Sequence, residues 1–182
     1  DGEAAEQVAE AVGGLGLRVD VSTEAGNATL IDAPRETYGP VDLFCANAGI
    51  VFEGDVDLPD SQWEHMWGVN FMAHVYAARH LVPEWKSRGG GYLVVTASAA
   101  GLLTSLGSAP YAVTKHAAVA FAEWVAITHG GSGIGVSVLC PQGVKTAMIE
   151  GDNPLSRMLM PGAVEPDQVA EDVVAGIRDE RF

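Results

Sequence analysis

Residues 91–98 read Gly-Tyr-Leu-Val-Val-Thr-Ala-Ser, a short apolar and β-branched run that predicts a buried parallel strand. Further along, Pro110-Tyr111-Ala112-Val113-Thr114-Lys115 opens an alanine-rich apolar segment that we expect to be a buried helix. On such a helix, Tyr111 and Lys115 stand at positions i and i+4 and share one face. Ser98 ends the strand, and ligands bind outside the carboxyl ends of strands in open α/β sheets.

These three side chains suit proton transfer to or from a substrate oxygen. The unperturbed phenol of a tyrosine has a pKa of about 10, which makes it a poor acid or base at neutral pH. A lysine cation beside the phenol favours the phenolate, so we expect Lys115 to lower the pKa of Tyr111. Ser98, Tyr111 and Lys115 together could hold a carbonyl or hydroxyl group and pass it a proton.

A serine at a strand end, thirteen residues before Tyr-x-x-x-Lys, resembles the short-chain dehydrogenase/reductase family, in its short single-domain branch. The resemblance implies an α/β fold with a doubly wound, Rossmann-like parallel sheet in three layers. It also implies hydride transfer between NAD(P) and an alcohol or ketone. Tyr111 is then the proton donor or acceptor, Ser98 polarises the substrate oxygen, and Lys115 also holds the nicotinamide ribose.

Asn70 is the fourth catalytic residue that the resemblance implies. It lies in a long helical pattern that Ser61 opens as a predicted N-cap, with Glu64 completing a capping box. A buried amide must find partners, and in the family an asparagine here holds a water next to the catalytic lysine. Within the same pattern, Pro83 predicts a late bend or break. The three histidines of this helix, His65, His74 and His80, are expected to be surface or packing residues.

The resemblance also implies cofactor contacts at several strand ends. Asn47-Ala48-Gly49 follows a strand predicted over 41–46 and matches the end of the family's Asn-Asn-Ala-Gly element, although Ala46 replaces the first asparagine. A strand over 17–21 places Asp20 toward the adenine amino group, with Val21 beside it. After a strand over 135–140, the family's Pro-Gly element is offset by Gln142. The expected cofactor-binding residues are Asp20, Val21, Asn47, Ala48, Gly49, Tyr111, Lys115, Pro141, Gly143, Val144 and Thr146.

Composition narrows the class of protein. The chain of 182 residues is 48% hydrophobic and has 22 glycines, which suits one domain over 1–182. Its formal charge of −14 disfavours nucleic acids and anionic membranes as partners. Without a long apolar run, it is expected to be cytoplasmic. Cys45 and Cys140 lack the spacing of metal ligands, so we expect reduced core thiols and no metal.

The order of predicted elements is helix, strand, helix, strand, which requires a parallel sheet with crossovers. A first helix is expected over 3–12, a second begins after Ser22 or Thr23, and a last helix follows Glu165. Residues 147–164, with Met148, Met158 and Met160, are expected to form a mobile flap over the substrate. The family's glycine-rich phosphate-binding turn does not occur, so we expect the first two strands to precede Asp1. A last edge strand is expected to follow Phe182.

Three readings of function remain at this stage. The first is an oxidoreductase, the second is another NAD(P)-dependent reaction such as epimerisation or dehydration, and the third is a non-catalytic dinucleotide-binding protein. Apolar residues on the helices over 62–88 and 111–128 favour a homotetramer or homodimer. The negative charge gives a weak preference for NAD over NADP.

Overall fold

The computed structural model describes residues 2–149, 157 and 159–182. Its centre is a parallel sheet of β1 (Leu43–Ala46), β2 (Gly91–Thr96) and β3 (Ile134–Leu139), in the order β1-β2-β3. The register sets Leu93 of β2 opposite Phe44 on one side and Val136 on the other. The predicted α/β class with a parallel sheet is therefore confirmed.

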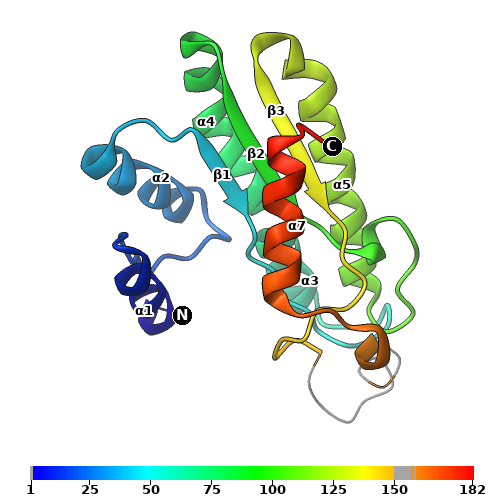
Figure 1. Cartoon of the computed structure of the whole chain (residues 1–182). Helices are drawn as coiled ribbons and strands as arrows, with labels where there is room; N and C mark the ends of the chain where they lie inside the picture. Colours follow the sequence, from blue (N-terminus) through cyan, green and yellow to red (C-terminus); the bar gives the residue numbers. More distant parts are fainter. Residues whose placement is uncertain (1, 150–156, 158) are drawn as a thin grey trace.

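Helices surround this sheet in the order that the sequence predicts (Figure 1). Helices α4 and α5 contact the sheet from one face, whereas α7 contacts β3 and crosses the other face. Short 3-10 turns follow β2 and α5 and precede α7. The helical elements are α1 (Gly2–Val12), α2 (Glu24–Tyr38), α3 (Asp60–Trp67), the π turn η1 (Gly68–Met72), α4 (Ala73–Arg88), η2 (Ala99–Gly101), α5 (Ala109–His129), η3 (Gly130–Ser132), η4 (Met160–Gly162) and α7 (Pro166–Arg178).

The core lies between the sheet and α4 with α5. Successive side chains of a strand point to opposite faces, so Leu93 and Val95 point the same way, and both are fully buried in the main core cluster. Trp85 of α4 is also fully buried, and its indole N–H donates to the Val41 carbonyl at 2.6 Å. This contact fixes the end of α4 against the start of β1.

Several predicted helix boundaries are confirmed. Helix α1 covers the predicted range, and α2 begins after Thr23, whose hydroxyl accepts a hydrogen bond from the Gly26 N–H at 3.0 Å. The alanine-rich segment forms α5, with Ser108 as its N-cap. Helix α7 follows Glu165 as expected.

The strand predicted over 17–21 is wrong. This segment lies outside the three-stranded sheet and pairs with no strand among the residues that the structure describes. Strand formation depends on a hydrogen-bonded neighbour, so a favourable local sequence alone does not produce it. Asp20 therefore stands in a turn leading to α2 and not at a strand end.

The helix over 61–88 differs from its prediction at two places. Helix α3 begins at Asp60 after Pro59, and no side chain caps it, so the capping box at Ser61 is wrong. The helical pattern is interrupted at η1, whereas α4 runs through Pro83 without a break. A π turn holds one more residue than an α-helical turn, so the interruption of the α-helical pattern precedes Pro83 by several turns.

The prediction of two core thiols is wrong for Cys45. On β1, Phe44 and Ala46 turn toward the core, whereas Cys45 is exposed on the opposite face with Leu43, which is 44% exposed. Among the helices of the described structure, α4 contacts β1. Cys140 is half-buried, and both thiols are free.

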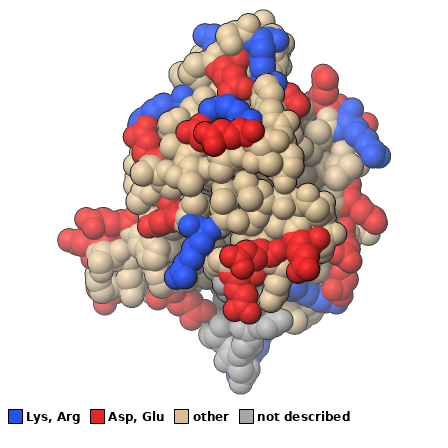
Figure 2. All heavy atoms as spheres, turned by 90° about the vertical axis from the view of Figure 1, so that its left-hand side faces the viewer, with Lys and Arg blue, Asp and Glu red and all other residues tan. Residues whose placement is uncertain are grey.

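Acidic side chains dominate the visible charge on the face that Figure 2 turns to the viewer, the side of α1 and α2. This distribution agrees with the formal charge of −14. No helix in the described part of the chain is both long enough and apolar enough to cross a membrane.

Candidate catalytic and cofactor site

The carboxyl ends of the three parallel strands meet at one edge of the sheet. Asn47 follows β1, Ser98 follows β2 and Pro141 follows β3. Backbone pairing continues past the strands, because the Ala97 N–H donates to Leu139 at 2.8 Å and the Ala99 N–H donates to Pro141 at 2.9 Å. These bonds hold the chain on either side of Ser98 and keep the ends of β2 and β3 together.

Tyr111 stands in the first turn of α5. The Ser108 hydroxyl accepts from the Tyr111 N–H at 3.2 Å, so the N-cap of the helix fixes this turn. Burial raises the pKa of the Tyr111 phenol, and a hydrogen bond with Ser98 partly offsets the rise. The expected lowering of this pKa is therefore not found in the protein without ligands, because desolvation outweighs the other effects.

Lys115 lies one turn after Tyr111 on the same helix face, as the spacing predicts. Its Nζ is 5.7 Å from the centroid of the Tyr111 ring and donates to the Thr96 carbonyl at 2.9 Å. The residue is 3% exposed, and burial lowers the pKa of its ammonium to about 8, with Cys140 acting in the opposite direction. The cation is thus held at the end of β2, beside the phenol.

Asn70 lies in the π turn η1 and is fully buried. Its Oδ1 accepts from the Ile50 N–H at 2.8 Å, and its Nδ2 donates to the Ile50 carbonyl at 2.9 Å and to Thr114 Oγ1 at 3.2 Å. The side chain therefore braces the loop after β1 against α5. Its backbone carbonyl lies on the π turn, and such turns are frequent at functional sites.

Gly49 lies close to the side chains of both Asn70 and Lys115. A Cβ built at Gly49 would stand 3.3 Å from Lys115 Nζ and 3.6 Å from Asn70 Oδ1. Asn47 and Ala48, which precede it, are exposed at the strand end. The structure thus brings Ser98, Tyr111, Lys115 and Asn70 together around the Asn47-Ala48-Gly49 turn.

Two buried polar residues of this region were not predicted to belong to the site: Thr114 was not considered, and His74 was expected to be a surface or packing residue. Thr114 is fully buried, and its hydroxyl donates to the Tyr111 carbonyl at 3.1 Å while accepting from Asn70. His74 is 1% exposed, and burial together with the Lys115 charge lowers its pKa to about 4. Thr114 follows Tyr111 by three residues, and His74 follows Asn70 by four. Residues at these spacings share a helix face, so the spacing could have indicated both of them from sequence.

The residues expected near the adenine lie in the segment before α2, where Ser22 packs against Gly68 of η1. Asp20 Oδ1 accepts from the Ser22 N–H at 2.9 Å and from the Ser22 hydroxyl at 2.7 Å, and these bonds lower the pKa of the carboxyl group. The Val21 carbonyl accepts from Asn27 Nδ2 at 2.6 Å. Asp20 is exposed, so its carboxylate remains accessible to a ligand.

The segment after β3 holds the remaining residues that are expected to contact the cofactor. Val144 makes an isolated parallel bridge with Val164, and Lys145 forms an ion pair with Glu165. Gly143 is buried, and a Cβ there would stand 3.2 Å from the Leu159 carbonyl, so little space remains for a side chain. Thr146 is exposed, and its hydroxyl donates to Val144 at 3.3 Å.

The flap predicted over 147–164 falls only in part on described residues. Met148 is 45% exposed and Met160 is 38% exposed. Met158 and residues 150–156 lie outside the described part of the chain. The flap therefore remains a prediction.

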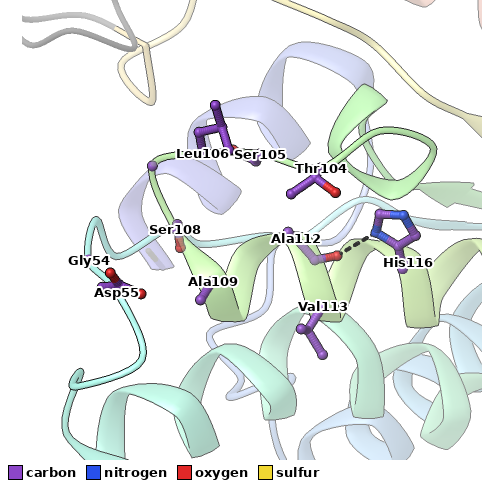
Figure 3. A pocket seen from close by; sticks show the side chains of 11 residues that line it. Gly54, Asp55, Thr104, Ser105, Leu106, Ser108, Ala109, Ala112, Val113 and His116 are labelled. Atoms are coloured by element: carbon purple, nitrogen blue, oxygen red, sulfur yellow. Dashed lines mark hydrogen bonds between the residues drawn. The ribbon is translucent and has the colours of Figure 1, made fainter.

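A cavity of about 880 Å³ opens beside the start of α5 (Figure 3). The loop at Gly54 and Asp55 borders it, and the segment before α5 pairs with that loop through Gly54 N–H to the Gly107 carbonyl at 3.0 Å. Its residues on α5 are Ala109, Ala112, Val113 and His116. Ser98 and Tyr111 do not line this cavity, so it is separate from the group around Lys115.

Comparisons with known proteins agree with this geometry. The model of the short chain dehydrogenase family matches residues 1–155. An uncharacterized NAD-dependent oxidoreductase of Mycobacterium tuberculosis is 38% identical over 138 residues, which are 75% of this chain and 50% of that protein. Human epidermal retinol dehydrogenase 2 is 33% identical over 90% of this chain and 54% of its own length.

A solved structure of a short chain dehydrogenase/reductase also matches this chain. A short chain dehydrogenase/reductase from Burkholderia phymatum, in complex with NAD, is 27% identical, with a TM-score of 0.87 over 99% of this chain and 73% of that one. The chain spans about half the length of the two relatives named above.

Proposed function

Because the chain belongs to the short-chain dehydrogenase/reductase family, we propose that it transfers a hydride between NAD(P) and an alcohol or ketone. The observation that carries this proposal is the group formed by Ser98, Tyr111 and Lys115 at the carboxyl edge of the sheet. In it, a half-buried phenol has its pKa raised by burial and lowered by Ser98, and its ring centroid lies 5.7 Å from the Lys115 Nζ. Each of these groups has a role in moving a proton at a carbonyl oxygen.

In the proposed reduction, Tyr111 donates its phenolic proton to the ketone oxygen and Ser98 donates a hydrogen bond to the same oxygen. The raised pKa of Tyr111 keeps the phenol protonated at neutral pH, so the group is ready to act as an acid. Lys115 then stabilises the phenolate that forms, because its cation lies beside the ring. In the direction of alcohol oxidation, the phenolate must form first, so this direction is expected to become faster as the pH rises.

The strand ends fit a nicotinamide dinucleotide. The Asn47-Ala48-Gly49 turn is exposed, and a side chain in place of Gly49 would crowd Lys115 Nζ. In the proposal, Lys115 and Tyr111 hold the nicotinamide ribose and Asp20 with Val21 lies toward the adenine. Gly143, Val144 and Thr146 contact the other end of the nicotinamide. When bound, NAD(P) accepts or supplies the hydride.

NAD is the cofactor that we propose over NADP. The relative from Mycobacterium tuberculosis is named an NAD-dependent oxidoreductase, and the structure from Burkholderia phymatum contains NAD. The acidic charge of the chain also disfavours an additional phosphate. The ratio of kcat/KM for NAD and NADP tests this choice, and a clear preference for NADP would contradict it.

We also propose that the chain forms a homodimer that can pair into a homotetramer. The outer face of α5 exposes Trp124 at 56% and Ile127 at 78%, and Trp67 of α3 is 39% exposed. The Trp67 and Phe71 rings lie 4.7 Å apart. Large apolar groups exposed together in this way mark an interaction surface. Val113, in the cavity of Figure 3, belongs to the same outer face of α5, so a partner on this face would also cover the cavity.

A cytoplasmic location is the remaining part of the proposal. Two free cysteines, one of them exposed at Cys45, are compatible with a reducing compartment.

Activity toward a panel of alcohols and ketones tests the proposal, with the absorbance of the reduced nicotinamide as the signal. Tyr111→Phe is expected to lower kcat by roughly 10²–10⁴-fold while cofactor affinity changes little, because Lys115 still holds the ribose. Tyr92→Phe is the matched control, because Tyr92 is hydrogen-bonded to Ser137 on the sheet at 2.8 Å, away from Lys115. Turnover by Tyr111→Phe within a few-fold of the wild type would contradict the assignment.

Epimerisation or dehydration is the second candidate. It would appear in the same panel as conversion of substrate without net change in nicotinamide absorbance. Binding of NAD without any conversion would indicate the non-catalytic alternative.

A further inference from the structure

The surface cavity of about 880 Å³ beside the start of α5 has no part in the proposed reaction (Figure 3). Val113 and His116, which line it, follow Tyr111 by two and five residues, and these spacings place them on a different face of the helix. Sites for small molecules typically have volumes of about 300–1,000 Å³. The cavity is therefore large enough for a second ligand, apart from the catalytic group.

Backbone hydrogen bonds join the two loops that border the cavity. Gly54, between β1 and α3, forms an isolated parallel bridge with Ser108, the N-cap of α5. The Gly54 N–H donates to the Gly107 carbonyl at 3.0 Å, and the Gly54 carbonyl accepts from the Ala109 N–H at 3.2 Å. Gly54 has a φ of +152°, which a side chain would strain. The border of the cavity is thus built by the chain itself and needs no ligand to form.

His116 gives the cavity a hydrogen-bond acceptor. The residue is exposed, and its Nδ1 lies 2.8 Å from the Ala112 carbonyl, one turn earlier on α5. A carbonyl oxygen can only accept, so Nδ1 carries the proton of the neutral ring and Nε2 keeps a lone pair. Within the described residues, Nε2 has no hydrogen-bond partner. It can therefore accept a hydrogen bond from a ligand.

The remaining lining favours an uncharged and largely apolar ligand. Leu106 and Val113 contribute exposed apolar side chains. Among the described residues, no lysine or arginine lines the cavity, so a phosphate or carboxylate group would meet the Asp55 carboxylate without a compensating cation. Asp55 is exposed and already accepts from the Val56 N–H, so an ion pair with a cationic ligand would contribute little. Figure 3 shows Asp55 and His116 at opposite ends of the lining, so the carboxylate leaves Nε2 free.

We propose that this cavity binds an uncharged, largely apolar molecule that carries a hydroxyl group, such as a phenol. The hydroxyl group donates a hydrogen bond to Nε2 of His116, and the apolar part of the molecule packs against Leu106, Ala109 and Val113. The inference does not depend on the proposed hydride transfer, because neither Ser98 nor Tyr111 lines the cavity. A second copy of the chain on the outer face of α5 is the competing occupant.

Binding of two isomeric probes tests the inference in the absence of cofactor. 4-Ethylphenol carries a hydroxyl group, whereas its isomer 4-methylanisole has an ether oxygen that cannot donate. In the wild type, we expect 4-ethylphenol to bind about threefold to tenfold more tightly, which is the effect of one net hydrogen bond. The NMR signals of the Val113 methyl groups and of the His116 ring report binding at the cavity and give the dissociation constants.

Variants of His116 identify the acceptor. His116→Phe removes the acceptor and keeps an aromatic ring, so we expect both probes to bind this variant with equal dissociation constants. His116→Gln, whose amide oxygen can accept, is expected to restore part of the difference. His129→Phe is the matched control, because His129 lies at the other end of α5, where its ring packs against Trp124. This control is expected to leave both dissociation constants unchanged.

Three results would overturn the inference. The first is an equal affinity of the wild type for the two probes. The second is a preference for 4-ethylphenol that persists in His116→Phe. The third is the absence of any shift at Val113 with either probe, which is the result expected if a second copy of the chain occupies the cavity. Each result leaves the proposed hydride transfer untouched, since that activity is measured with cofactor and in separate variants.

Discussion

Asn70→Ala is expected to be strongly destabilising, although the substitution removes no charge and little apolar surface. The side chain is fully buried and makes three hydrogen bonds, two to the backbone of Ile50 and one to Thr114. Alanine can make none of them. The change therefore leaves the Ile50 N–H, the Ile50 carbonyl and the Thr114 hydroxyl each short of one partner.

The magnitude follows from these three bonds. A net hydrogen bond contributes about 0.5–1.5 kcal/mol, and a buried group left unpaired costs about 1–3 kcal/mol. Ile50 is half-buried, so water can reach part of its backbone and reduce the cost. The expected loss is about 2–4 kcal/mol in the free energy of unfolding. For a chain of this length it corresponds to a decrease in Tm of roughly 5–15 °C.

Urea unfolding followed by tryptophan fluorescence and by circular dichroism measures this loss. Asn47→Ala is the matched control, since Asn47 is exposed and makes no hydrogen bond in the described structure, and its change is expected to stay within about 0.5 kcal/mol. A loss below about 1 kcal/mol for Asn70→Ala, or equal losses for the two variants, would refute the bracing role.

The fold's stability should fall as the pH decreases from 6.5 to about 4, because His74 is neutral in the folded protein and the unfolded chain binds the proton first. The full effect is about 3 kcal/mol at about 1.36 kcal/mol per pKa unit, and His74→Leu should abolish it in urea titrations across this pH range. Gly101→Ala should lower the free energy of unfolding by about 1–3 kcal/mol and displace Lys115, since its Cβ would stand 2.6 Å from the Lys115 carbonyl. Gly107→Ala is its control, because a Cβ there meets nothing within 4 Å. Equal stabilities of these two glycine variants would count against this steric argument. Trp124→Glu places a charge on the exposed face of α5 and should give a monomer in light scattering, and an unchanged mass would exclude this face as the interface.

Local sequence was sufficient to predict those helices and strands whose own residues favour them. Helix α5 is predicted by an alanine-rich run that Pro110 opens, and the structure begins the helix one residue earlier, at Ala109. Strand β2 is predicted by its β-branched run and is paired on both sides. Because α5 is the first long helix after β2, Ser98, Tyr111 and Lys115 could be brought together from sequence.

Non-local effects limited the remaining predictions. Residues 17–21 have the composition of a strand, but pairing depends on a neighbour that is distant in sequence. The pKa of Tyr111 could not be predicted from Lys115 alone, because the depth of burial sets the larger effect. The π turn at Gly68–Met72 and the burial of His74 depend on packing between α4 and α5 that no local pattern encodes.

The π turn also changes the direction in which side chains point on the two helices that it joins, α3 and α4. An α-helix advances about 100° per residue, so the one additional residue in Gly68–Met72 rotates all of α4 by about that angle relative to α3. Because of this rotation, Trp67 before the π turn is exposed to solvent, whereas Trp85, eighteen residues later on the same helical segment, is buried in the core.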